Sequence, residues 1–137
     1  TATLTQPMNT LVDEIRNNLS DMPADMIRDY IIRMQLRCYE LSEPKDKAAM
    51  KSQLAESIKK EKYSQALLEA DGTVNVKDTK ATLAVSEEII VEALYDLVAN
   101  TLKTKLDSGY RMVDSLKSVL MSRMQEAKFM NMGTSIE

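Results

Sequence analysis

Apolar residues recur along the second half of the chain with the spacing of one long helix. The steps between them are three or four residues, about 3.67 residues per turn on average. The row consists of Leu94, Val98, Leu102, Leu106, Gly109, Val113, Leu116, Leu120, Met124 and Ala127. Ser86-Glu87-Glu88 precedes it, with a capping hydroxyl and two acids suited to a helix N-terminus. The pattern predicts a helix from Ser86 to about Phe129, followed by a frayed polar tail over 131–137.

Gly109 allows two interpretations of this helix. Asp107-Ser108-Gly109 could form a turn between two shorter helices, since a glycine inside a helix costs up to about 1 kcal/mol relative to alanine. However, the apolar row passes through Gly109 in phase. A small residue on a buried row also lets a second helix approach closely. We favour a continuous helix, and the turn remains the alternative.

The first half of the chain shows three shorter helical stretches, over 7–19, 23–41 and 45–70. In the third, the apolar positions are Met50, Leu54, Ile58, Tyr63, Ala66 and Leu67. Pro44 disfavours a helical residue before it and lacks a backbone donor, so we expect a break there. One kinked helix over 23–70 is the alternative.

Only 73–77 has the β-branched alternation of a strand, and Gly72 marks the turn before it. We therefore expect an all-α fold of long antiparallel helices with one short extended stretch. It forms a single domain over 1–137, with an N-terminal arm (1–22), helices (23–72), an extended connection (73–85), the long helix (86–130) and a tail (131–137).

The long apolar row offers more surface than its shorter partners can cover, which favours a homo-oligomer. The expected interface comprises Leu94, Val98, Leu102, Leu106, Gly109, Val113, Leu116 and Leu120.

The composition offers little chemistry. The chain has no His, and Cys38 is its one cysteine, on the apolar face of a predicted helix. Neither a Cys-His or Ser-His pair nor a zinc ligand set can be assembled. We expect no enzymatic activity, no cofactor and no metal. No apolar run approaches the roughly 20 residues of a membrane span, and the start does not resemble a signal peptide. We expect no membrane contact and a cytoplasmic location, in the host cell if a phage encodes the chain.

Two basic clusters are candidate nucleic-acid sites despite a formal net charge of −3. Each combines cations, which can neutralise phosphates, with a tyrosine on which a base can stack. The first cluster is Lys59, Lys60, Lys62 and Tyr63, and the second is Lys103, Lys105, Tyr110 and Arg111. The alternative is ordinary helix-surface charge, with Glu56 pairing to Lys60 one turn away and Asp107 beside the second cluster.

The region 56–120 resembles the UvsY-type recombination mediators of tailed phages and related small helical phage proteins. The shared outline is a Lys-rich helix ending in Tyr (58–63), a Gly-containing turn with a short extended stretch (71–76), and a polar lead-in (77–81) to a long helix that begins with acids. A small-residue, aromatic and basic junction (108–113) completes it. The chain departs from the family in being acidic overall and in having a helical start before Pro23.

The resemblance implies a non-enzymatic accessory protein that oligomerises and binds single-stranded DNA through Lys59, Lys60 and Lys62. Its further partners would be a recombinase, which it helps to load, and a single-strand-binding protein. The alternative function is a structural or scaffolding helical protein, either a phage particle component or a regulator, that acts through protein contacts alone.

Overall fold

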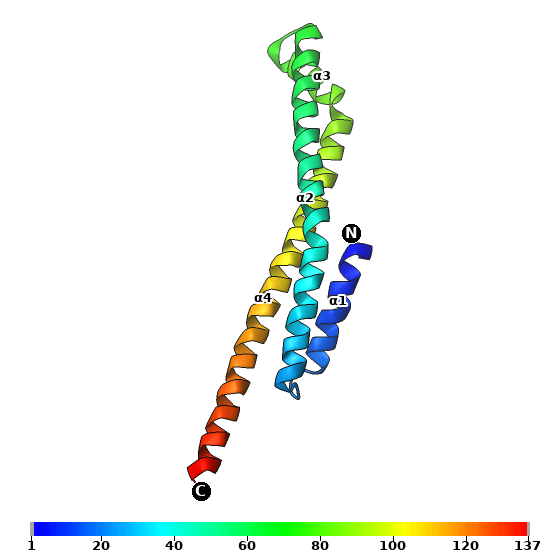
Figure 1. The fold of residues 1–137 in the computed structure, drawn as a ribbon. Coiled ribbons are helices and arrows are strands. Elements are labelled where there is room, and N and C mark those ends of the chain that lie inside the picture. The colour runs from blue at the N-terminus through cyan, green and yellow to red at the C-terminus, as the bar shows by residue number, and fades with distance from the viewer. Residues whose placement is uncertain (1, 137) are drawn as a thin grey trace. The chain divides into compact units, whose positions relative to one another are not determined.

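The computed structural model describes the backbone of residues 2–136 and the side chains of residues 2–131, and all regular structure in that part of the chain is helical. The four helices are α1 (Ala2–Asn17), α2 (Ala24–Glu69), α3 (Val74–Ala84) and α4 (Ser86–Ile136), shown in chain order in Figure 1. The expected all-α fold is confirmed.

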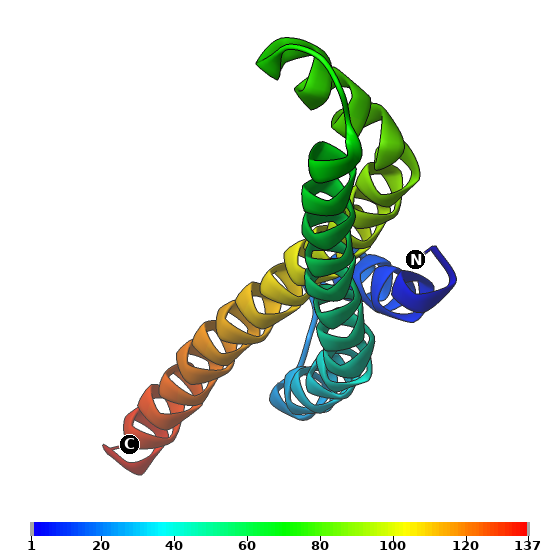
Figure 2. The same cartoon turned by 90° about the horizontal axis from the view of Figure 1, so that it is seen from above.

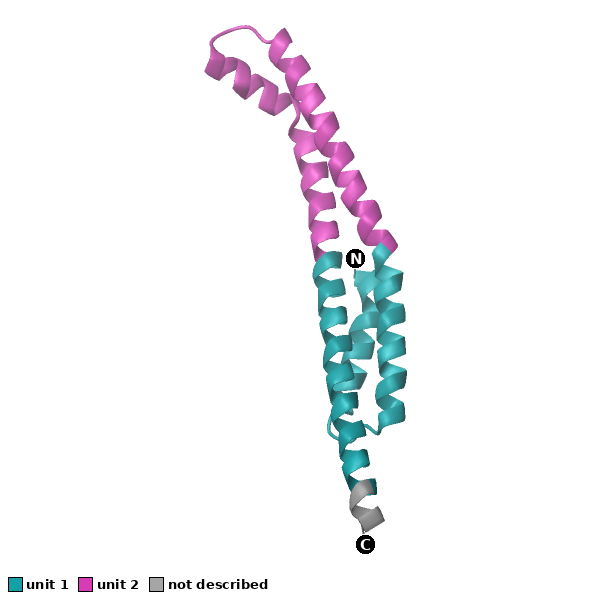
Figure 3. Cartoon of the chain, turned by 60° about the vertical axis from the view of Figure 1, so that its left-hand side comes forward, with its two compact units in different colours: residues 1–42, 102–137 teal, residues 43–101 magenta. Residues whose placement is uncertain are grey.

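The chain divides into two compact units, each built from parts of α2 and α4 (Figure 3). Unit 1 comprises residues 1–42 and 102–137, and unit 2 comprises residues 43–101. The sequence predicts a single domain over 1–137, and both unit boundaries lie inside continuous helices, where composition gives no linker signal.

Unit 1 is a three-helix arrangement with a well-filled core. Its α1 packs on both α2 and α4, and each helix contributes apolar residues at helical spacing. The buried apolar side chains are Met8, Leu11, Ile15, Met22, Ile27, Tyr30, Ile31, Met34, Cys38, Leu41, Leu102, Leu106, Val113 and Leu116. The position of Cys38 on an apolar helix face is thereby confirmed.

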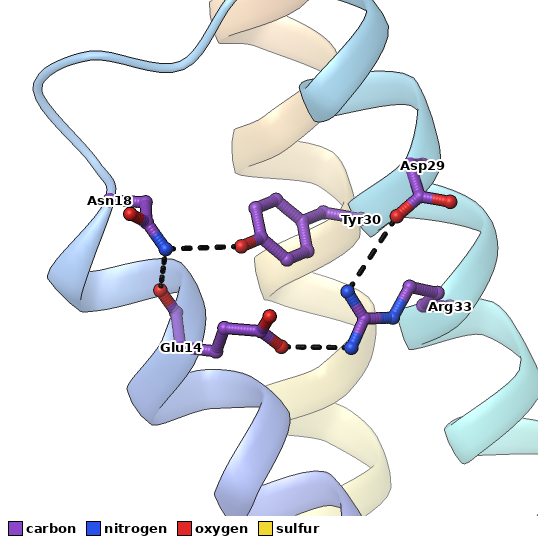
Figure 4. A network of polar contacts seen from close by, with 5 residues as sticks. All are labelled: Glu14, Asn18, Asp29, Tyr30 and Arg33. Atoms are coloured by element: carbon purple, nitrogen blue, oxygen red, sulfur yellow. Dashed lines mark hydrogen bonds and ion pairs between the residues drawn. The ribbon is translucent and has the colours of Figure 1, made fainter.

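A polar network fastens the end of α1 to α2 in unit 1 (Figure 4). Arg33 bridges Glu14 on α1, at 2.8 Å, and Asp29 on its own helix, at 3.6 Å. The Asn18 side-chain amide donates to the Tyr30 hydroxyl at 3.2 Å and to the backbone carbonyl of Glu14 at 2.9 Å. The Arg33 guanidinium also lies 5.3 Å from the centre of the Tyr30 ring. These contacts orient α1, whose apolar stripe packs into the core of the unit.

Unit 2 has a much thinner core of small residues. The α2 and α4 segments run antiparallel, since Ser52 contacts Asp96 while Lys62, further along α2, contacts Glu88, which lies earlier in α4. Its buried residues are Ala48, Ser52, Ala55, Ala81 and Val85. On α2 the buried residues are Ala48, Ser52 and Ala55, whose small side chains let α4 approach closely.

In the helix over 45–70, the structure buries a different face from the one expected. Met50 and Leu54, expected on its apolar side, are exposed, and Leu54 retains 61% of its accessible surface. Helical periodicity alone does not distinguish the alanine stripe at Ala48 and Ala55 from the bulkier stripe beside it. In unit 2 the large apolar side chains are left outside.

The expected break before Pro44 is wrong, and the alternative of one helix is closer to the structure. Helix α2, which is 46 residues long, continues through Pro44. Buried positions keep helical spacing across it, from Leu41 to Ala48 and Ser52. Packing on both sides therefore outweighs the lost backbone hydrogen bond, which costs about 3 kcal/mol in an unsupported helix.

The expected extended stretch over 73–77 is also wrong, because Val74 begins α3, the green segment after α2 in Figures 1 and 2. Only Thr73 is extended, with φ −71° and ψ 166°, and its side chain caps the helix by accepting from the Val76 backbone N–H at 3.4 Å. Gly72 makes the turn before α3 with a φ of +119°, a backbone conformation that residues with side chains rarely adopt. A capping hydroxyl thus overrides the weak β preference of the residues that follow.

The long helix is continuous through Gly109, as expected, and it extends further than expected. Helix α4 runs for 51 residues to Ile136, so 131–136 are helical instead of frayed. The last residue of the expected tail, Glu137, lies outside the described part of the chain.

Candidate functional site

The first predicted site, the lysine cluster of α2, lies in unit 2 and is engaged by carboxylates of the same unit. Lys59 forms an ion pair with Glu92, and Lys62 forms one with Glu88, both on α4. Lys60 pairs with Glu56 one turn earlier at 2.9 Å, as the alternative of ordinary helix-surface charge expects.

Tyr63, the aromatic member of this cluster, also has a partner within unit 2. Its hydroxyl donates to the Asp78 carboxylate on α3, and this hydrogen bond to a negative group raises the pKa of Tyr63. Its ring is half-buried. Lys59, Lys62 and Tyr63 therefore join α2 to α3 and α4, and Lys60 pairs within α2, so the cluster is not an open cationic platform.

The ion pairs of the α2 lysines make a pH prediction. The hydrogen bond from Lys62 lowers the pKa of Glu88, and the one from Lys60 lowers the pKa of Glu56. Because these folded-state pKa values lie below the ordinary glutamate value of about 4.3, the stabilisation is present at neutral pH and is lost as the pH falls through the lowered values. Lys62→Met should return the pKa of Glu88 towards its ordinary value.

NMR titration of the glutamate side-chain carboxyl carbons measures this change. Glu56 is the internal control, since its partner Lys60 is untouched in Lys62→Met. An equal pKa of Glu88 in the wild type and in the variant would contradict the ion pair.

The second predicted site, on α4 in unit 1, splits into buried and open parts. Lys105 is half-buried and donates to the Asn9 side-chain oxygen at 2.8 Å, so it joins α4 to α1. Lys103, Tyr110 and Arg111 are exposed, and within the described residues they form no ion pair or hydrogen bond, not even with Asp107. These three remain open to a ligand.

Sequence reasoning omitted Lys117, which lies on the same exposed flank of α4, seven residues beyond Tyr110. Asp107 and Asp114 lie among these cations. Three cations against two carboxylates give this flank a net charge of about +1, which is small for a surface that binds a phosphate backbone.

The expected oligomer interface is mostly core within one chain. Leu102, Leu106, Gly109, Val113 and Leu116 are buried in unit 1. Leu94 is exposed in unit 2, whereas Val98 and Leu120 are half-buried. Helices α1 and α2 cover the middle of the row, so that part serves the fold of a single chain.

Sequence reasoning missed an apolar groove in unit 2, which has a volume of about 400 Å³. One wall is α2 and the other is α4. Its lining residues are Lys51, Leu54, Ala55, Ile58, Glu87, Glu88, Val91 and Tyr95. The available signal was the presence of two apolar stripes on α2, since α2 can bury only one of them against α4.

The described side chains offer little further chemistry. No group of three or more Asp, Glu or Cys side chains among them is arranged to hold a metal ion. None of their buried N or O atoms lacks a hydrogen-bond partner. Burial raises the pKa of the Cys38 thiol, which disfavours the nucleophilic thiolate. Within the same described region, no helix combines the length and apolar character needed to cross a membrane.

Comparison with protein-family models, with curated proteins and with solved structures found no match to this chain. The resemblance to UvsY-type mediators therefore stays a prediction from the residues quoted above.

Proposed function

We propose that this protein is a non-enzymatic helical scaffolding or regulatory component that acts through protein–protein contacts. The observation that supports this function is the surface of unit 2, where the lysines of the α2 cluster are paired and large apolar side chains are exposed. There, the lysines predicted to bind nucleic acid are neutralised by Glu56, Glu88 and Glu92, while large apolar side chains occupy the surface. Exposed apolar surface between helices is typical of a face that another protein covers.

Single-stranded DNA binding, with a role in recombinase loading, is the second candidate. It is favoured by the open trio Lys103, Tyr110 and Arg111, which combines cations with an exposed aromatic ring. In that function DNA would follow the exposed flank of α4, and the α2 lysines would contribute little.

Binding of labelled oligo(dT) at two salt concentrations separates these functions. If Lys59, Lys60 and Lys62 contacted three phosphates, replacing all three with alanine would reduce the slope of log affinity against log salt by about 2. We expect instead weak binding by the wild type, and no difference between this variant and a matched one with Lys45, Lys47 and Lys77 replaced by alanine.

The matched variant has the same change in net charge at other positions, so only a local contact distinguishes the two. A selective loss of binding and of salt dependence in the first variant would contradict the proposed function. Tight binding that is lost in Lys103→Ala/Arg111→Ala would favour the second candidate.

A further inference from the structure

Unit 2 presents an incomplete helix bundle. Leu54 and Ile58 on α2 lie across a groove from Val91 on α4, and all three side chains are exposed. In unit 1 a third helix, α1, packs against the same two helices, whereas no residue of α3 lines the groove of unit 2. Two antiparallel helices with an uncovered apolar groove need further helices to bury it.

The charges along this groove differ between its two ends. Lys51 stands at one end, with its ammonium 5.7 Å from the centre of the Tyr95 ring. Glu87 and Glu88 stand at the other end, where Lys62 neutralises Glu88 and leaves Glu87 as the excess charge. Each end therefore carries about one net charge, and the two charges are of opposite sign.

We propose that the groove of unit 2 docks the same groove of a second copy of this chain, with the helices of the two copies antiparallel. This inference rests on the proposed function in protein contacts. A twofold axis perpendicular to the helices places Lys51 of each copy towards the Glu87 end of the other. The opposite arrangement, with like ends together, brings the two Lys51 side chains of the dimer close to each other, and likewise the two Glu87 side chains. Both approaches are repulsive.

In the resulting dimer, the α2 and α4 segments that line the two grooves form a four-helix bundle. The axis crosses the groove midway between Lys51 and Glu87, at the level of Ile58 and Val91. Each of these residues then faces the equivalent residue of the second chain across the interface. The apolar residues of the two grooves form a common core, and the charge pairs set the direction of docking.

Cross-linking tests this geometry directly. Val91→Cys should form a covalent dimer under mild oxidation, because the two introduced thiols meet at the axis. Ile89→Cys is the matched control: Ile89 is 41% exposed and Val91 43%, but Ile89 lies outside the groove. Buried Cys38 is left in place in both variants. Equal cross-linking of both variants, or none in Val91→Cys, overturns the proposal.

Charge reversal tests the direction of docking without disturbing the apolar core. Lys51→Glu and Glu87→Lys should each weaken the dimer at least about tenfold in sedimentation equilibrium. The double variant Lys51→Glu/Glu87→Lys should restore most of the wild-type affinity. Additive weakening in the double variant overturns the antiparallel arrangement.

A wild-type protein that stays at the single-chain mass of 15.4 kDa at every concentration also overturns the dimer, and assigns the groove to a different protein. The proposed function in protein contacts would survive that result, since DNA binding contradicts it and a single-chain mass does not.

Discussion

Replacing Gly109 with leucine is expected to lower the free energy of unfolding by about 3 kcal/mol or more, because three helices meet at this residue. A Cβ atom at Gly109 would lie 2.6 Å from the Cys38 sulfur on α2 and 3.0 Å from the Met8 methyl on α1. The Met8 side chain is flexible and can yield, whereas the short Cys38 side chain cannot. Leucine therefore forces α4 away from α2, and urea denaturation measures the loss.

A double-mutant cycle with smaller changes isolates the contact from general disruption. Gly109→Ala gains up to about 1 kcal/mol of helix propensity, but its methyl group meets the Cys38 sulfur. The substitution should destabilise the wild type and become neutral or stabilising in Cys38→Ala, where the sulfur is gone. An equal effect of Gly109→Ala in both backgrounds would contradict this close approach.

The second large effect is expected at Leu102, a member of the apolar row that is 0% exposed. Leu102→Ala should cost about 2–5 kcal/mol of unfolding free energy, because it leaves a cavity in the core of unit 1. Leu97→Ala makes the same change on the same helix at a residue that is 63% exposed, and it should cost less than about 0.5 kcal/mol.

Thermal or urea unfolding of both leucine variants, at protein concentrations low enough to avoid self-association, provides the comparison. Similar losses at Leu102 and Leu97 would mean that the middle of the row is not the core of a single chain. The row would then regain its role as an oligomer interface.

The sequence predicted α4 well because its apolar row is long and regular. Gly109 lies on that row, and the structure explains its small size by the approach of Cys38 and Met8. Local signals were less reliable at Pro44 and over 73–77. At Pro44, packing on both sides outweighs one residue that is unfavourable in a helix. Over 73–77, the Thr73 cap before α3 outweighs a weak preference for strand.

The candidate nucleic-acid site was harder to predict because it depends on pairs distant in sequence. Lys60 has its partner one turn away, which the sequence shows. Lys59 and Lys62 pair with residues more than 25 positions later, and that pairing depends on the register of α2 against α4. The same register decides that alanines face α4 while Leu54 faces outward.

Light scattering of the purified protein, with and without single-stranded DNA at low and high salt, tests the proposed function most directly. We expect a protein-only assembly of twice the 15.4 kDa chain mass, unchanged by DNA at either salt concentration. A mass that rises when DNA is added at low salt, and returns to the protein-only value at high salt, would contradict it and show electrostatic DNA binding.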